Sequence, residues 1–258
     1  MDLRLVPETA YRSASQIARV ATEKWALDNF YCASCGAGLT PYPASTPLYD
    51  FHSPDCQERF QLKASRRQFG SSLLDSEYST ALDGILKDAY PSLILLRYDA
   101  IRWVVSDLEL IHRACITTSC LKRRKPLSAT AKRAGWEGCM ISLASVPTLG
   151  RIGVVRNGNI RPKKAILEQW KQSSRLLETE PRARGWVADV LTCVERLYST
   201  FTLENVYSFE KELAQKHPKN QHVRPKIRQQ LQALRDLGLI EFVSPGVYRR
   251  VSQITNSM

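Results

Sequence analysis

The chain has 258 residues, enough for one large domain or two smaller ones, and its mean hydropathy of -0.29 is typical of a soluble globular protein. The 37 lysines and arginines exceed the 25 acidic residues, and the net charge of +12 favours nucleic acid as partner over a basic protein without a polyanion. No apolar run approaches the roughly 20 residues of a membrane helix, and the first residues do not resemble a secretory signal. We therefore expect a cytoplasmic protein.

The first predicted element is a helix over Ser13–Asn29, where apolar residues recur at helical spacing. Ser13 and Gln16 can form a capping box at its start. Glu23 lies within this helix. A solvated surface glutamate is the simpler interpretation of it, and support of a nearby metal ion is the alternative.

Cysteines at a characteristic spacing follow this helix. Cys32 and Cys35, with Gly36 directly after them, are typical of one half of a metal knuckle, because such a turn aims both thiolates at one point. His52 and Cys56, with three residues between them, can supply the other half of a tetrahedral zinc site. A thioredoxin-like redox pair is the rival interpretation of the first two cysteines, but no βαβ pattern follows them. The seven cysteines of the chain are odd in number and unevenly spaced, which does not suit a disulfide framework.

The stretch around Cys56 also carries the most promising chemistry. Phe60 and Leu62 alternate with Gln61 and Lys63, which is the period of a half-buried strand with one polar face. Asp50, on the preceding strand, can meet that face. A carboxylate, an amide oxygen and an ammonium gathered in this way can bind a divalent metal and a phosphate.

Alternating helices and strands predict an α/β arrangement for the next part of the chain. We expect a helix over Asp75–Asp88, buried strands over Ser92–Tyr98 and Ile101–Ser106 with a tight turn between them, a strand over Ile152–Val155, and an exposed helix over Pro162–Leu177.

The densest basic run, Lys122–Cys139, interrupts this pattern. Trp136 lies in it between Gly135 and Gly138, where the backbone can approach a ligand closely. An aromatic ring among basic residues suits stacking on a base while phosphates are held. A solvated charged surface and a buried core tryptophan are the simpler alternatives, and the sequence does not exclude them.

The last part changes character after a predicted linker near Pro181. Helices are expected over Trp186–Tyr198, from an N-cap at Thr202 to about Lys216, and over Arg224–Leu237, followed by a hairpin with a Ser-Pro-Gly turn. Three helices and a hairpin are the order of a winged helix. A protein-docking module of the same shape is the alternative, but the third helix is rich in Arg, Lys and Gln, which suit phosphates and base edges.

Three stretches of the chain are long and unusual: K-P-L-S-A-T-A-K-R-A-G-W-E-G-C (Lys125–Cys139), R-G-W-V-A-D-V-L-T-C (Arg184–Cys193) and K-I-R-Q-Q-L-Q-A-L-R-D (Lys226–Asp236). They resemble the DpnI family of methyl-directed restriction endonucleases. The resemblance implies an α/β fold with a PD-(D/E)xK nuclease core, a mixed sheet flanked by helices with a zinc knuckle, over residues 1–181. A C-terminal winged-helix domain would occupy residues 182–258.

The resemblance also implies roles for single residues. Asp50 and Lys63 correspond to the aspartate and lysine of the nuclease motif, and Gln61 stands where the family usually has glutamate. Asp50, the Gln61 amide oxygen and the Leu62 carbonyl would hold Mg²⁺, while Lys63 would stabilise developing charge and orient or deprotonate the attacking water.

Further roles concern zinc and DNA. Cys32, Cys35 and Cys56 match three zinc cysteines, and because Ser53 stands where a fourth would be, His52 is the candidate substitute. Trp136 matches the tryptophan that resembles a methyl sensor. The residues expected to bind DNA and the methylated base are Lys125, Arg133, Trp136, Arg224, Lys226, Arg228, Gln229 and Gln230.

The function implied is Mg²⁺-dependent cleavage of double-stranded DNA at G-A-T-C-like sites that carry N6-methyladenine. The main alternative is a non-cleaving methyladenine reader or DNA-binding regulator whose nuclease site decayed at Gln61. A zinc-stabilised interaction module fits the basic third helix poorly. We expect a prokaryotic, nucleoid-associated protein with DNA as its partner, no membrane association and no obligatory protein partner.

Overall fold

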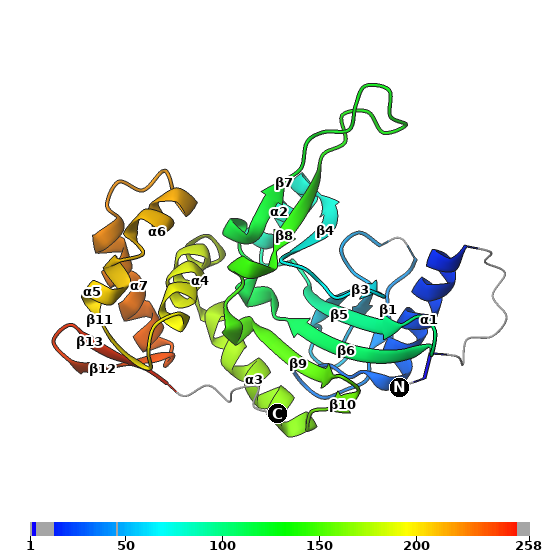
Figure 1. The fold of residues 1–258 in the computed structure, drawn as a ribbon, viewed down its shortest axis with the longest axis horizontal. Coiled ribbons are helices and arrows are strands. Elements are labelled where there is room, and N and C mark those ends of the chain that lie inside the picture. The colour runs from blue at the N-terminus through cyan, green and yellow to red at the C-terminus, as the bar shows by residue number, and fades with distance from the viewer. Residues whose placement is uncertain (1, 4–12, 45, 252–258) are drawn as a thin grey trace.

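A mixed seven-stranded sheet forms the centre of the N-terminal part. The computed structural model describes residues 2–3, 13–44 and 46–251. The strand order is β1-β2-β3-β5-β6-β9-β10, and within it β3 and β5 run parallel while the other neighbours are antiparallel (Figure 1). The strands are β1 (Thr40–Pro41), β2 (Phe51–His52), β3 (Arg59–Ser65), β5 (Ser92–Asp99), β6 (Val104–Ile111), β9 (Arg151–Arg156) and β10 (Asn159–Ile160).

Successive side chains of the central strand β5 enter two different cores, as the alternation of a strand requires. Ile94 and Leu96 belong to the core under α1 (Ala14–Asn29) and α3 (Lys163–Ser174). Leu93 and Leu95 belong to the core on the opposite face, which α2 (Tyr78–Leu86) and α4 (Pro181–Glu195) cover. The sheet is therefore packed on both faces, and the α/β class predicted for this part is confirmed.

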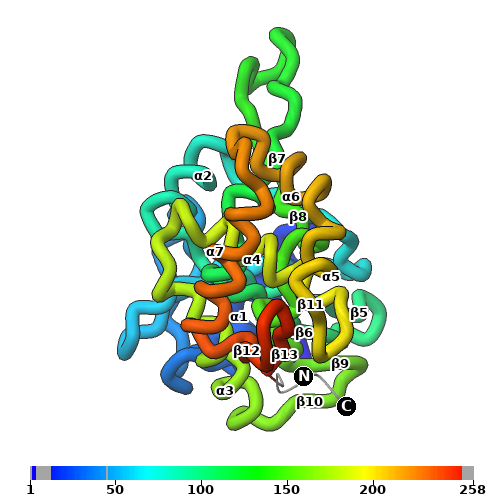
Figure 2. Tube along the Cα trace, turned by 90° about the vertical axis from the view of Figure 1, so that its left-hand side faces the viewer, coloured from blue at the N-terminus to red at the C-terminus, as the bar shows by residue number. Residues whose placement is uncertain are grey.

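A second, three-stranded sheet lies on the α2 side in the order β4-β8-β7. Its strands are β4 (Ser72–Glu77), β8 (Gly138–Ser142) and β7 (Leu121–Arg123). The segment 124–137 between β7 and β8, which we name the basic finger, projects from the body in both views (Figures 1 and 2). Short 3-10 helices connect other elements at Arg113–Cys115, Thr118–Cys120, Leu143–Ser145, Thr148–Gly150 and Arg175–Glu178.

The C-terminal part has the predicted order of a winged helix, but the single helix expected from Thr202 to about Lys216 is divided into two. Its elements are α4, β11 (Thr200–Thr202), α5 (Leu203–Tyr207), α6 (Glu210–Lys216), α7 (Val223–Asp236), β12 (Ile240–Ser244) and β13 (Val247–Arg250), with strand order β11-β13-β12. The Thr202 N-cap is confirmed, because its side chain accepts from the Asn205 N–H in a reciprocal capping box. Strand β11, which completes the wing sheet, was not predicted.

The predicted linker near Pro181 is wrong. Pro181 is in the first turn of α4, where its fixed φ suits a helix start, and Arg184 and Gly185 are buried. Apolar residues of α4 belong to one continuous core with Leu93 of β5 and Leu231 of α7. Helix α4 is therefore shared by both parts of the chain.

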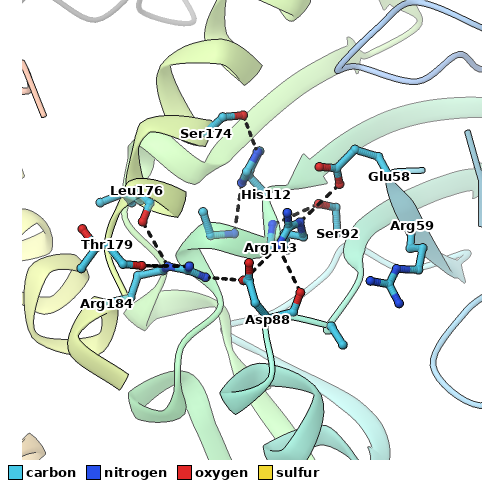
Figure 3. A network of polar contacts seen from close by, with 12 residues as sticks. Glu58, Arg59, Asp88, Ser92, His112, Arg113, Ser174, Leu176, Thr179 and Arg184 are labelled. Atoms are coloured by element: carbon cyan, nitrogen blue, oxygen red, sulfur yellow. Dashed lines mark hydrogen bonds and ion pairs between the residues drawn. The ribbon is translucent and has the colours of Figure 1, made fainter. Parts of the chain in front are cut away.

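A polar network also ties α4 to the N-terminal part (Figure 3). Arg184 of α4 pairs with Asp88 at 2.7 Å, and Asp88 pairs with Arg113 at 2.9 Å. The Arg113 guanidinium also lies 3.4 Å from the Glu58 carboxylate, directly before β3. The network thus runs from α4 to the hairpin that carries Asp50 and Gln61.

Three further boundaries differ from prediction. The capping box of Ser13 and Gln16 is absent, because the Ser13 hydroxyl contacts the Ser15 hydroxyl instead and makes no capping hydrogen bond. The helix predicted from Asp75 begins only at Tyr78, and residues 75–77 belong to β4. The strand predicted over Ile101–Ser106 is shifted to Val104–Ile111. Within the part of the chain that the structure describes, no helix has the length and apolarity needed to span a membrane.

Candidate active site

Asp50 lies at the outer edge of β3, opposite Gln61 and Leu62. Between β2 and β3 the pairing involves only the first residues of β3, and just beyond it the Asp50 N–H donates to the Phe60 carbonyl at 2.9 Å. The Leu62 N–H in turn donates to the Asp50 carboxylate at 2.7 Å. Because N–H and C=O of one strand residue point to the same side, the Leu62 carbonyl also faces this open edge.

The amide oxygen of Gln61 is buried and has no hydrogen-bond partner among the described residues. Leaving a buried acceptor unsatisfied costs about 1–3 kcal/mol, so such an atom in a folded protein calls for an explanation. A bound cation at the strand edge supplies one, because it would coordinate this oxygen. The residues present therefore fit a metal site.

A cavity of about 360 Å³ brings Glu23 of α1 together with Asp50, Gln61 and Leu62. Glu23 pairs with Arg19 at 2.6 Å and keeps 31% of its side chain exposed. Two carboxylates, an amide oxygen and a backbone carbonyl are the donors that hard divalent cations prefer. Glu23 thus lies beside the candidate metal site, which supports the second interpretation of this residue, support of a nearby metal ion.

The electrostatics of this edge act on Asp50. Burial raises the pKa of its carboxyl, and the nearby Glu23 carboxylate adds to the rise. The Leu62 N–H, the Lys63 ammonium and the Arg19 guanidinium work against it without cancelling it. An ionised Asp50 is therefore less stable in the folded protein than in water, and a cation beside it would relieve that cost.

Asp50→Asn is expected to raise the melting temperature of the metal-free protein at neutral pH by about 1–3 °C. The folded-state pKa is raised, so the ionised wild-type carboxylate opposes folding above that pKa. The advantage of the variant should shrink as the pH falls through the raised pKa and the wild type becomes protonated. Differential scanning calorimetry across pH measures this. Asp28→Asn, on the exposed side of α1, is the control, and an equal rise there would contradict the assignment.

Lys63 lies on the same face of β3 as Gln61, as the alternation predicts. Its ammonium contacts the Asp75 carboxylate at 2.6 Å, and the Asp75 side chain is fully buried. Asp75 was not among the predicted site residues, because its segment was assigned to a helix. No local pattern marks a strand aspartate as the partner of a lysine from another sheet.

The cysteine knuckle assembles next to this hairpin. The sulfurs of Cys32, Cys35 and Cys56 lie within 4.8 Å of one another and could hold a metal ion. The buried Ser53 hydroxyl lies 3.2 Å from the Cys35 sulfur. Burial opposes ionisation of Cys35, but hydrogen bonds from Ser53 and the Ala37 backbone outweigh it and lower the pKa of that thiol.

The structure does not bring His52 into this group. Its ring packs against Tyr42 instead, with centroids 4.8 Å apart. Strand alternation explains the difference, because Phe51 turns into the core that also holds Cys32, His52 turns to the other face, and Ser53 turns back. The serine thus occupies the place in which His52 was expected.

The basic finger carries Lys125, Arg133 and Trp136. Trp136 is half-buried and lies outside both core clusters, and the Arg133 guanidinium stacks 4.6 Å from the centre of its ring. A Cβ at Gly138 would lie 2.7 Å from that ring, so any other residue there would displace the ring. The interpretation as a core tryptophan is therefore wrong.

Helix α7 presents Arg224, Arg228 and Gln229 to solvent and keeps Lys226 half-exposed. Gln230 is only 4% exposed and shares the inner face with Ile227 and with two leucines of the same helix. Residues three or four apart share a helix face, so the phase of Ile227 places Gln230 inside. The structure thus removes Gln230 from the surface predicted to bind DNA.

A mixed α/β part with a cysteine knuckle, followed by a helix-turn-helix part of the winged type, defines a two-part protein of DNA-binding class. A protein-family model described as DpnI, the Dam-replacing family, matches residues 1–179, and one described as the Dam-replacing HTH domain matches residues 182–250. The chain belongs to the DpnI family.

Proposed function

We propose that the protein is a Mg²⁺-dependent endonuclease that cleaves double-stranded DNA at G-A-T-C-like sites carrying N6-methyladenine. The observation that carries the proposal is the unpartnered Gln61 oxygen beside Asp50 and Glu23, with Lys63 on the same strand face. Family membership and the net charge of +12 support DNA as the substrate. We place the nuclease domain at residues 1–181 and the winged-helix domain at residues 182–258.

The residues at the edge of β3 have different roles in phosphodiester hydrolysis. Asp50, Gln61 and Leu62, with Glu23, would hold Mg²⁺, which when bound polarises the scissile phosphate and lowers the pKa of a water. The Leu62 N–H fixes the Asp50 carboxylate in place. The Lys63 ammonium stabilises the charge that develops on the phosphate and orients the attacking water.

Gln61→Glu is expected to lower the Mg²⁺ concentration for half-maximal cleavage by about tenfold, because a carboxylate binds this cation more tightly than a neutral amide. The measurement is the cleavage rate as a function of Mg²⁺ concentration. Gln68→Glu, at an exposed position, adds the same charge away from the site and should leave the requirement unchanged. An unaltered requirement in the Gln61 variant would remove Gln61 from the ligand set.

Methyl selectivity needs more than one contact. Burying one methyl group in an apolar slot against Trp136 contributes about 0.8 kcal/mol, roughly a factor of four. The finger, with Lys125, Arg133 and Trp136, and α7, with its exposed Arg224, Arg228 and Gln229, supply two reading surfaces whose preferences multiply. Coupling of recognition to cleavage enlarges the ratio further.

Incubation of the purified protein and Mg²⁺ with methylated and unmethylated copies of one plasmid tests the function. We expect cleavage of the methylated copy alone. Cleavage of neither, together with good binding, would favour the alternative of a methyladenine reader or regulator with a decayed site at Gln61. Equal cleavage of both would keep the nuclease and remove the methyl dependence.

The cysteine group is proposed to hold a structural zinc ion. Metal analysis should find about one zinc per chain, held by Cys32, Cys35 and Cys56, and its absence would make these residues plain thiols. Because Ser53 lies beside Cys35, Ser53→Cys completes a four-thiolate site. We expect this variant to retain zinc at about tenfold higher chelator concentration than the wild type. Ser34→Cys, on the exposed side of the same turn, is the control.

A further inference from the structure

Asp75 is a fully buried carboxylate whose oxygens both have partners. One oxygen contacts the Lys63 ammonium at 2.6 Å, and its side chain has no exposed surface. The other accepts a short hydrogen bond from the Tyr90 hydroxyl and a longer one, 3.4 Å, from Ser76. An interior carboxylate with this set of donors has one fixed position.

An irregularity in β4 aims Asp75 at Lys63. The pairing of β4 with β8 runs from Leu74 opposite Met140 directly to Glu77 opposite Gly138. Asp75 and Ser76 thus face the single residue Cys139, which is the count of a β-bulge. The Cys139 thiol donates to the Ser76 carbonyl at 3.3 Å, a backbone group within the bulge. Bulges commonly re-aim side chains beside functional sites.

Tyr90 holds the far side of this arrangement. Its ring is buried, and its backbone N–H donates to the Gly84 carbonyl at 2.9 Å. Burial and the Asp75 charge raise the pKa of the Tyr90 hydroxyl well above its usual value, so it stays protonated and donates. The carboxylate therefore keeps its second oxygen occupied and presents the first to Lys63.

We infer that Asp75 is a positioning residue that holds the catalytic ammonium of Lys63 in place for cleavage. The inference rests on the proposed function, since it takes Lys63 as the group that meets the phosphate. A lysine side chain is long and flexible, and its ammonium has three donors. One donor bound to Asp75 fixes the ammonium, and the others remain for the phosphate and the water.

Asp75, the partner of Lys63, lies on a strand that is connected to the basic finger. Strand β4 pairs with β8, and β8 begins where the basic finger ends. The Tyr78 N–H, directly after β4, donates to the carbonyl of Glu137 in the finger at 2.9 Å. Asp75 thus joins the catalytic strand β3 to the sheet from which Trp136 projects.

Asp75→Asn tests the inference, because it keeps the shape of the side chain and removes its charge. Single-turnover cleavage of a methylated duplex should slow by about 100-fold, as expected for a mispositioned catalytic group. The dissociation constant for the same duplex, measured without Mg²⁺, should change by less than about threefold, since Lys63 keeps its charge. Asp83→Asn, an exposed aspartate of α2 that pairs with Lys87, is the matched control and should cleave at the wild-type rate.

The outcomes separate the inference from the function on which it rests. A wild type that cuts no methylated DNA overturns the nuclease itself. If the wild type cleaves and Asp75→Asn cleaves equally fast, only the positioning role is overturned. The same holds if Asp75→Asn loses as much affinity for the duplex as it loses in cleavage rate. Should Asp75→Asn fail to fold, Tyr90→Phe decides, because it removes only the hydroxyl. We expect it to slow cleavage by about fivefold with unchanged binding, and an unchanged rate overturns the inference.

Discussion

Lys63→Ala is expected to reduce the cleavage rate by about a thousandfold, because it removes the cation that stabilises the phosphate charge and orients the water. DNA binding should remain nearly intact, since many lysines and arginines share the contact with the backbone. Cleavage and binding of the same methylated duplex measure the two effects. Lys87→Ala, an exposed lysine directly after α2, is the control. Retained cleavage would show that Lys63 is not catalytic.

Lys63→Ala should also affect stability, and a second variant separates this effect from the effect on catalysis. Without Lys63, the buried Asp75 carboxylate loses its cation, which lowers the free energy of unfolding. Lys63→Ala combined with Asp75→Asn removes the stranded charge. The double variant should recover stability but not cleavage. Recovery of both would mean that the loss in the single variant came from misfolding.

Arg184→Ala is expected to lower the free energy of unfolding by about 2–3 kcal/mol. The guanidinium is 5% exposed, pairs with Asp88 and donates to the carbonyls of Leu176 and Thr179 (Figure 3). Removing it takes one donor from each of these acceptors and empties a buried position at the junction of α4 with the N-terminal part, while Asp88 keeps Arg113 and the Leu176 carbonyl keeps the Thr179 N–H. Denaturant titration measures the loss. Arg182→Ala, exposed on the same helix, should change the free energy by less than about 0.5 kcal/mol.

The Arg184 effect also has a pH dependence with a definite sign. Burial of Asp88 opposes its ionisation, but the Arg184 hydrogen bond and the Arg113 charge outweigh burial and lower the pKa of that carboxyl. A depressed carboxyl pKa stabilises the fold above the unfolded value, about 3.9, and this contribution is lost as the pH falls through the folded value. The difference in the free energy of unfolding between Arg184→Ala and the wild type should therefore become smaller below about pH 4. A constant difference down to pH 2 would contradict the Asp88 contribution.

Local signals predicted the elements that depend on local physics. The Thr202 cap, helix α7 and the wing hairpin all follow from spacing within a dozen residues. The alternation of Gln61 and Lys63 likewise placed both on one strand face. Gln230 was predictable in principle, because it lies three residues after the buried Ile227.

The features that were missed depend on distant partners. Asp75 reaches Lys63 only because a bulge displaces it, and nothing in the adjacent residues distinguishes a bulged strand from a helix start. Pro181 is as typical of a linker as of a first helical turn, and only the packing of α4 decides between them. The contact of Ser53 with Cys35 likewise requires the fold.

Because both parts of the chain pack on α4, neither truncation nor domain exchange can separate them simply. Val187, Val190 and Leu191 are buried in a core that also contains Leu93 of the central sheet and Leu231 of α7. A truncation before Pro181 would strip the N-terminal part of this cover and leave an apolar surface prone to aggregation. A chimera that exchanges winged helices between relatives therefore has to transplant α4 together with the residues on which it packs. The packing of α4 against both parts also constrains the evolution of a new DNA specificity. Substitutions on the exposed side of α7 are tolerated far more freely than substitutions in α4.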